Sequence, residues 1–245
     1  MKQYIYADNA ATTQLDPQAF EAMIPWLRDE YGNASQPYSF SRKPKKAIAE
    51  ARAVIAECIN ADPEEIYFTS GGTESDNWAI KGSAFSDSGH HATITSQIEH
   101  HAVLHSCEAT ERIGYPVAYL PADEEGRILP ETLDRYISDR TRLVSVITAN
   151  NEIGTIQDIA GLADISHAHG AMFHTDAVQA VGHIPIDVKA LDVDMLSASA
   201  HKFNGPRGIG FLYIRKGIKV CPFMDGGGQE NKNRAGTENT AAIVG

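Results

Sequence analysis

The chain has 245 residues, of which 42% are hydrophobic and 22% are charged, a composition that suits a globular protein with a sizeable core. Its 21 Lys and Arg residues against 32 Asp and Glu residues give a formal net charge of −11, which argues against a nucleic-acid or anionic-membrane surface. The three cysteines form no Cys-x-x-Cys pair, so neither a disulfide framework nor a structural zinc site is expected. This cysteine usage predicts a reducing compartment. With no signal-peptide pattern and no membrane-length apolar stretch, the sequence predicts a cytoplasmic protein.

Short apolar strands alternate with amphipathic helices along the chain. Strands are expected at 66–70, 91–96, 115–120, 142–150, 171–177, 194–200 and 208–214. Helices are expected from about Thr73, over 98–114, over 130–138 and over 158–170, and another opens in the last residues. This alternation predicts an α/β fold of three layers, with a mainly parallel sheet and helices on both of its faces.

Polar residues follow five of the expected strands, at the point where each strand ends. They are Gly71–Glu74, Glu99–His101, Asn150–Glu152, Asp176 with Gln179, and His201 with Lys202. Turn propensity accounts for any single one of these groups. Because ligands bind open α/β sheets at the carboxyl ends of the strands, five such groups together favour a binding site at that edge.

The segment "TSGGTES", after the first expected strand, predicts a phosphate site at a helix N-terminus. Small residues let a ligand approach the backbone, and the free N–H groups and dipole of the helix attract an anion. The segment matches neither the P-loop nor the dinucleotide-binding fingerprint. A plain N-cap by Ser70 or Thr73 explains it equally well, so both interpretations stay open.

Lys202 and Asp176 both stand at the ends of apolar strands, where an unpaired charge is costly. A structural ion pair between them is one explanation. The other is pyridoxal phosphate, which needs a lysine for a Schiff base and an aspartate for its pyridinium nitrogen. One cofactor would also explain the remaining groups, with His100 stacked on the ring and the phosphate held by Ser199, His201 and Thr73.

The ten histidines do not predict a metal site. His90, His91, His167 and His169 fall at loop or helix ends and are expected to be solvated. His101 and His105 lie four residues apart on one expected helix, so they could bind a metal together, but the sequence shows no third ligand.

Seven segments form an ordered set that runs from near the start of the chain to its last residues. They are "DNAATT", "FTSGGTESDN", "EHHAVL", "NNEIGTIQDI", "HTDAVQAVGHIPID", "SASAHKFNGPRGIG" and "RAGTEN". In this order they resemble the motifs of cysteine desulfurases, in the class V aminotransferase group of fold-type I pyridoxal-phosphate enzymes. The resemblance implies the fold of that group and its cofactor, pyridoxal 5′-phosphate.

Enzymes of this family form homodimers that take sulfur from L-cysteine, release L-alanine and leave a persulfide on an enzyme cysteine. That sulfur supplies iron–sulfur cluster assembly or tRNA thiolation. The resemblance therefore implies an L-cysteine substrate, a homodimer, and sulfur-acceptor or iron–sulfur scaffold proteins as partners. The acidic composition adds that nucleic acid and membranes are not expected partners.

The resemblance gives the polar residues individual roles. Lys202 would bind the cofactor covalently and then act as the acid–base group at the substrate Cα, and His100 would stack on the ring as a second catalytic group. Asp176 would pair with the pyridine nitrogen, and Gln179 would contact the phenolic oxygen. Asn151 would contact the cofactor or the substrate carboxylate.

The phosphate has its own set of implied contacts. Gly72, Thr73, Ser199 and His201 would bind it, and Thr237 would reach the phosphate of the cofactor in the other subunit. By the same resemblance, residues 1–15 form an N-terminal segment and residues 16–245 form the cofactor-binding large domain. Family members are usually longer, so we expect their small domain, with its sulfur-accepting cysteine and substrate-binding arginine, to be absent from this chain.

Several features depart from the family pattern. None of Cys58, Cys107 and Cys221 matches the sulfur-accepting loop, so all three are expected to be inert packing thiols. Near the entrance, Tyr38, Ser41 and Pro44 stand where histidine, glycine and alanine are common. Two alternatives remain: a related enzyme such as a selenocysteine lyase, and a non-catalytic dimerising remnant. Retention of the lysine and the aspartate argues against the remnant.

Overall fold

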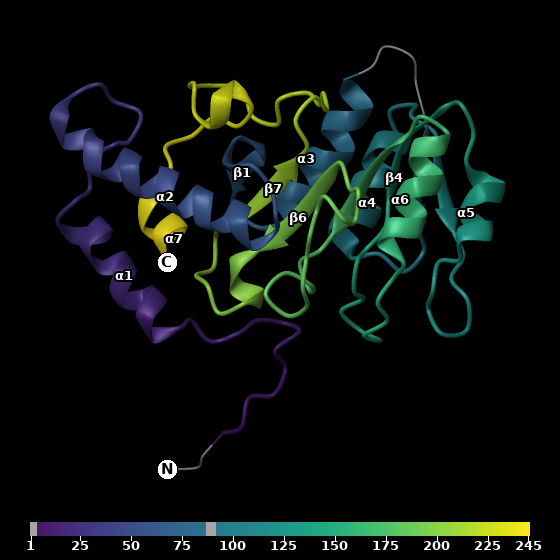
Figure 1. Cartoon of the computed structure of the whole chain (residues 1–245), viewed down its shortest axis with the longest axis horizontal. Helices are drawn as coiled ribbons and strands as arrows, with labels where there is room; N and C mark the ends of the chain where they lie inside the picture. Colours follow the sequence, from purple (N-terminus) through teal and green to yellow (C-terminus); the bar gives the residue numbers. More distant parts are fainter. Residues whose placement is uncertain (1–3, 87–91) are drawn as a thin grey trace.

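A single sheet forms the centre of the computed structural model, which describes residues 4–86 and 92–245 (Figure 1). Its strands in the described residues are β1 (Ile66–Thr69), β2 (Ala92–Ser96), β3 (Val117–Leu120), β4 (Thr141–Ser145), β5 (Met172–Asp176), β6 (Met195–Ser199) and β7 (Gly210–Ile214). Their order is β1-β7-β6-β5-β4-β2-β3. Neighbouring strands are parallel except at β7, which runs antiparallel to both β1 and β6. The prediction of a mainly parallel sheet is confirmed.

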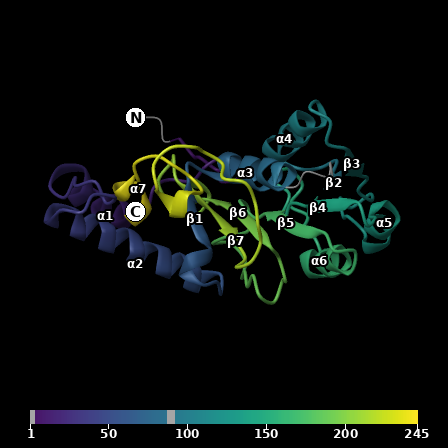
Figure 2. The same ribbon diagram turned by 90° about the horizontal axis from the view of Figure 1, so that it is seen from above.

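Helices pack on both faces of this sheet. The α-helices of the described residues are α1 (Pro17–Arg28), α2 (Arg42–Cys58), α3 (Gly72–Phe85), α4 (His101–Glu111), α5 (Pro130–Tyr136), α6 (Ile159–Ala168) and α7 (Thr240–Val244). Figure 2 shows α3 and α4 on one side of the sheet and α6 on the other.

The core follows from the two-residue period of the strands, because successive side chains point to opposite faces. In β4, Leu143 packs in an apolar cluster with Trp78 of α3, whereas Val144 packs in a second cluster with Leu162 of α6. All four side chains are completely buried. Two separate cores on the two faces confirm the three-layer arrangement.

The structure also corrects several expected boundaries. The strand expected at 142–150 ends at Ser145, although Thr148 N–H still donates to the Asp176 carbonyl at 2.8 Å. The helix expected at 98–114 begins at His101, because His100 has extended backbone and caps the helix. Helix α1 precedes the first element that the sequence analysis assigned.

The N-terminal segment lies along the turn that follows β6. Thr13 N–H donates to the carbonyl of His201 at 2.9 Å, and Asp16 N–H donates to that of Asn204 at 2.8 Å. These bonds place residues just after Asp8 beside Lys202. Among the described residues, no helix has the length and apolar character needed to cross a membrane.

Candidate active site

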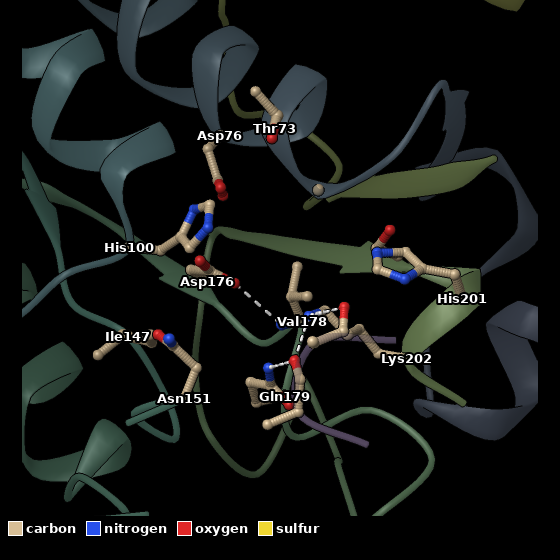
Figure 3. A pocket seen from close by; sticks show the side chains of 14 residues that line it. Thr73, Asp76, His100, Ile147, Asn151, Asp176, Val178, Gln179, His201 and Lys202 are labelled. Carbon is tan, nitrogen blue, oxygen red and sulfur yellow. Dashed lines mark hydrogen bonds between the residues drawn. The ribbon is translucent and has the colours of Figure 1, made fainter. Parts of the chain in front are cut away.

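Nine of the ten predicted site residues line one cavity of about 400 Å³ at the carboxyl edge of the sheet (Figure 3). The nine are Gly72, Thr73, His100, Asn151, Asp176, Gln179, Ser199, His201 and Lys202. They come from α3, from the N-cap of α4, and from the segments after β4, β5 and β6. The topology therefore brings together residues that are up to 130 positions apart in the sequence (Gly72 to Lys202).

Lys202 ends the short 3₁₀ turn Ala200–Lys202 that follows β6. Its Nζ donates hydrogen bonds to the carbonyl oxygens of Ala10 and Ala11, the second at 3.0 Å. Burial lowers the pKa of Lys202, while the nearby Asp176 and Asp8 carboxylates oppose that shift. Lys202 and Asp176 do not form an ion pair within 4.0 Å, so a structural Asp–Lys pair does not explain the two residues.

Asp176 ends β5 and is 2% exposed. Its carboxylate accepts a hydrogen bond from Val178 N–H at 2.9 Å. Burial raises the pKa of Asp176, and the Val178 N–H and Lys202 partly offset that effect. A buried carboxyl that faces a cavity and lacks a cationic partner is suited to a cationic group of a ligand.

His100 presents a neutral imidazole to the same cavity. Its Nδ1 accepts a hydrogen bond from Ala102 N–H at 3.1 Å, which leaves the proton of the neutral ring on Nε2. Burial lowers the pKa of His100, and the positive charges of Lys202 and His101 lower it further. The ring is therefore a flat, uncharged surface with one N–H donor.

One end of the cavity is formed by the start of α3. The N-cap is Gly71, with φ of +144°, and no side chain caps the helix. The interpretation of a plain N-cap by Ser70 or Thr73 is therefore wrong, and the first-turn N–H groups are free for an anion. Gly72 is packed so closely that a Cβ there would lie 2.5 Å from Cγ2 of Val178.

A second cavity, of about 340 Å³, shares four lining residues with the main cavity: Gly72, Thr73, Ser199 and His201. Arg207 also lines this cavity. The Nδ1 atom of His201 lies 3.0 Å from Thr12 Oγ1, within hydrogen-bond distance. Burial lowers the pKa of His201, and the positive charges of Lys202 and Arg207 lower it further. With His201 neutral, Arg207 supplies the full positive charge at this end.

The two amide side chains lie farther along the wall of the main cavity. Gln179 donates from Nε2 to the Ala10 carbonyl at 2.8 Å, and Asn151 donates from Nδ2 to Glu152 Oε1 at 2.9 Å. Both retain a carbonyl oxygen toward which a ligand could donate. Figure 3 shows Gln179 and Asn151 on the same side of the cavity.

Comparisons with known proteins give one consistent result. Residues 5–245 match the family model described as aminotransferase class-V. The chain belongs to the aminotransferase class-V family. It is 54% identical over 243 residues to the cysteine desulfurase IscS of Methanosarcina thermophila and 53% identical over 247 residues to that of Dictyoglomus turgidum. These matches include 98% and 100% of this chain. The chain spans only 60% and 62% of the length of these two relatives.

Similar solved structures agree with the fold. A NifS-like protein superposes with a TM-score of 0.96 at 40% identity, over 99% of this chain and 67% of that one. A structure described as SspA in complex with cysteine gives a TM-score of 0.95 at 41% identity, over 98% of this chain and 70% of that one.

Thr237 is the predicted residue that does not line the main cavity. It lies in a separate cavity of about 140 Å³, with Gly208, Arg234 and Asn239 among its neighbours. The predicted role of Thr237 toward another subunit stays a prediction.

Sequence reasoning missed five further residues that line this cavity: Ala10, Ala11, Asp76, Ile147 and Val178. Asp76 reads as an ordinary acidic residue in the first turns of a helix, so its burial had no signal in the sequence. Val178 could have been predicted as a cavity residue, because it lies two residues after Asp176, the residue that ends β5 at the cavity.

Some expectations for histidine and cysteine were wrong. His167 is only partly solvated: its side chain is 27% exposed, and Nε2 lies 2.8 Å from Asp194 while Nδ1 lies 3.0 Å from Asp192. His169 is exposed, as predicted. Cys58 is exposed and so is not a packing thiol, whereas Cys107 is buried as expected, and burial raises its pKa to about 12. His90 and His91 lie outside the described residues.

Proposed function

We propose that this protein binds pyridoxal phosphate and contributes the cofactor-binding large domain of a cysteine desulfurase. The observation that carries the proposal is the convergence of Lys202, Asp176 and His100 with a helix N-terminus on one cavity. The names of the relatives support L-cysteine as the substrate, as does the cysteine complex of a similar structure.

The donor set of the cavity fits this cofactor. Asp176 supplies a carboxylate for the pyridine nitrogen, and Lys202 supplies a primary amine to the same cavity. The phosphate would meet the uncapped start of α3, Ser199 and His201, with a close backbone approach at Gly72. In addition, Asp76 Oδ1 is a buried oxygen without a partner among the described residues, and Asp76 lines this cavity.

When bound, pyridoxal phosphate supplies an electron sink that stabilises negative charge at the substrate Cα. Asp176 would hold the proton on the pyridine nitrogen, which maintains that capacity. Lys202 would move a proton at Cα, a task helped by its lowered pKa, because a general base must be able to lose its own proton. The Nε2–H of His100 is placed to donate a proton within the same cavity.

The overall reaction would convert L-cysteine and an acceptor thiol to L-alanine and a persulfide. The C–S bond of the substrate breaks, an S–S bond forms, and the substrate carbon receives a proton. None of the three cysteines, Cys58, Cys107 and Cys221, lines the main cavity. We therefore propose that the acceptor thiol belongs to another segment or protein, and that a homodimer, iron–sulfur scaffold partners and a cytoplasmic location follow the family pattern.

The test begins with cofactor binding by the chain as it is. Titration with pyridoxal phosphate should give the visible absorbance of a lysine-bound cofactor. Lys202→Ala should abolish this absorbance, and Lys216→Ala, at an exposed surface ion pair with Glu64, should not. An unchanged spectrum in Lys202→Ala would refute the assignment of Lys202.

A second experiment addresses the reaction. The protein is incubated with L-cysteine or L-selenocysteine in the presence of a small dithiol as acceptor, and alanine and chalcogenide are measured. Alanine with sulfide supports a desulfurase, and strong preference for selenocysteine supports the related lyase. A protein that folds but binds no cofactor would support the non-catalytic alternative.

A further inference from the structure

The floor of the main cavity holds a second carboxyl beside Asp176. Asp76, from the second turn of α3, is 1% exposed and lines the cavity with Asp176 and His100. Oxygen atoms of the two aspartates and a ring nitrogen of His100 all lie within 4.8 Å of one another. Figure 3 shows Asp76 and Asp176 reaching into the space around the His100 ring.

Within residues 4–86 and 92–245, no cation balances the charge of an ionised Asp76. Its nearest basic side chain is His174, whose Nε2 lies 3.8 Å from Asp76 Oδ1. His174 is completely buried, with Nδ1 at 2.8 Å from Ser145 Oγ and Nε2 at 2.9 Å from Ser197 Oγ. Burial lowers the pKa of His174 to about 3, so this ring is neutral.

The other groups that face Asp76 make its ionised form still less favourable. Asp176 is acidic, Glu99 is buried with its pKa raised to about 8, and His100 is neutral for the reasons given above. The hydroxyl of Ser197 favours the ionised form, but burial and then the charge of Asp176 raise the pKa of Asp76 well above its ordinary value. Two carboxylates this close in a buried site cannot both ionise at neutral pH.

The contacts decide which of the two carboxyls holds the proton. Asp176 accepts the Val178 N–H and lies near Lys202, and both interactions favour its carboxylate. Asp76 Oδ1 has no hydrogen-bond partner among the described residues. Of the two carboxyl groups, Asp76 is therefore the one that is protonated.

We infer that Asp76 is a positioning residue that remains a neutral carboxylic acid, so that Asp176 alone carries the negative charge facing the ring nitrogen of the cofactor. One carboxylate balances one pyridinium, whereas a second ionised carboxyl would leave an uncompensated buried charge. This inference rests on the proposed cofactor, but the protonation of Asp76 is a property of the protein alone.

The experiment uses protein labelled with ¹³C at the aspartate carboxyl groups and follows the stretching band of protonated aspartate by infrared spectroscopy. At mildly alkaline pH the cofactor-free protein should retain this band. Asp76→Asn should remove it, and Asp164→Asn, an exposed position on α6, should not. Loss of the band at neutral pH in the unsubstituted protein would overturn the inference, and this measurement does not depend on folding of any variant.

Cofactor titrations complete the test. At neutral pH, Asp176→Asn should lose about tenfold or more in affinity for pyridoxal phosphate, because the carboxylate that faces the ring nitrogen would be gone. The acid side of the affinity–pH profile should not move in Asp76→Asn, since an amide and a neutral acid influence Asp176 alike. A shift of that side to lower pH would show that Asp76 is an anion. Failure of the unsubstituted protein to bind the cofactor would refute the proposed function, and the infrared result would still decide the state of Asp76.

Discussion

Replacing Glu99 by glutamine should remove a pH-dependent loss of stability. Glu99 is 6% exposed, and its Oε1 accepts hydrogen bonds from Ser96 Oγ at 2.5 Å and from Ile147 N–H at 2.9 Å. Its Oε2 is buried without a partner among the described residues. Burial raises the pKa of Glu99 from 4.5 to about 8.

The sign of the effect follows from proton binding. The folded protein keeps a proton on Glu99 that the unfolded chain releases once the pH exceeds about 4.5. The unfolding free energy therefore falls as the pH rises from about 4.5 to about 8. With 1.36 kcal/mol for each pKa unit, the loss between pH 5 and pH 8 is roughly 3.5 kcal/mol.

Glutamine keeps the carbonyl oxygen that accepts both hydrogen bonds and cannot ionise. Urea unfolding of the cofactor-free protein, followed by circular dichroism from pH 5 to pH 8, should give a flatter profile for Glu99→Gln by roughly 3 kcal/mol. Glu124→Gln, in an exposed turn, serves as the matched control. Parallel profiles for Glu99→Gln and the unsubstituted protein would refute the argument, because Glu99 would then be ionised in the folded state.

Three further predictions follow from the cavities and the cysteines. Arg207→Gln should lower the affinity for pyridoxal phosphate about tenfold, because Arg207 lies at the proposed phosphate end. Binding of unphosphorylated pyridoxal should not change, and equal losses of affinity for both ligands would contradict this role. Gly72→Ala should destabilise the fold by about 1–3 kcal/mol in thermal unfolding, because its Cβ would meet Val178, whereas Gly228→Ala has open space and should not. Alkylation followed by mass spectrometry should label Cys58 in the folded protein and Cys107 after unfolding, since burial raises the pKa of Cys107 to about 12; early labelling of Cys107 would argue against its burial.

Local pattern was sufficient to predict the order of strands and helices and the edge at which polar residues gather. The "TDA" end of β5 and the "AHK" turn after β6 carry this information in a few consecutive residues, because an apolar strand that ends in a charged residue is unusual. Pattern could not predict the burial of Asp76, which depends on how α3 packs against β5 and β6. The same limit applies to His167, whose partners Asp192 and Asp194 are 25 and 27 residues away.

Two neutral histidines limit the positive charge of the site in the absence of a ligand. His100 and His201 have lowered pKa values because they are partly desolvated and lie near the charge of Lys202, so neither adds a positive charge. Lys202 is held by the carbonyls of Ala10 and Ala11 rather than by Asp176. In the proposed function, a covalent bond between Nζ and the cofactor would displace at least one of these two hydrogen bonds, and Asp176 would stay available for the ring nitrogen.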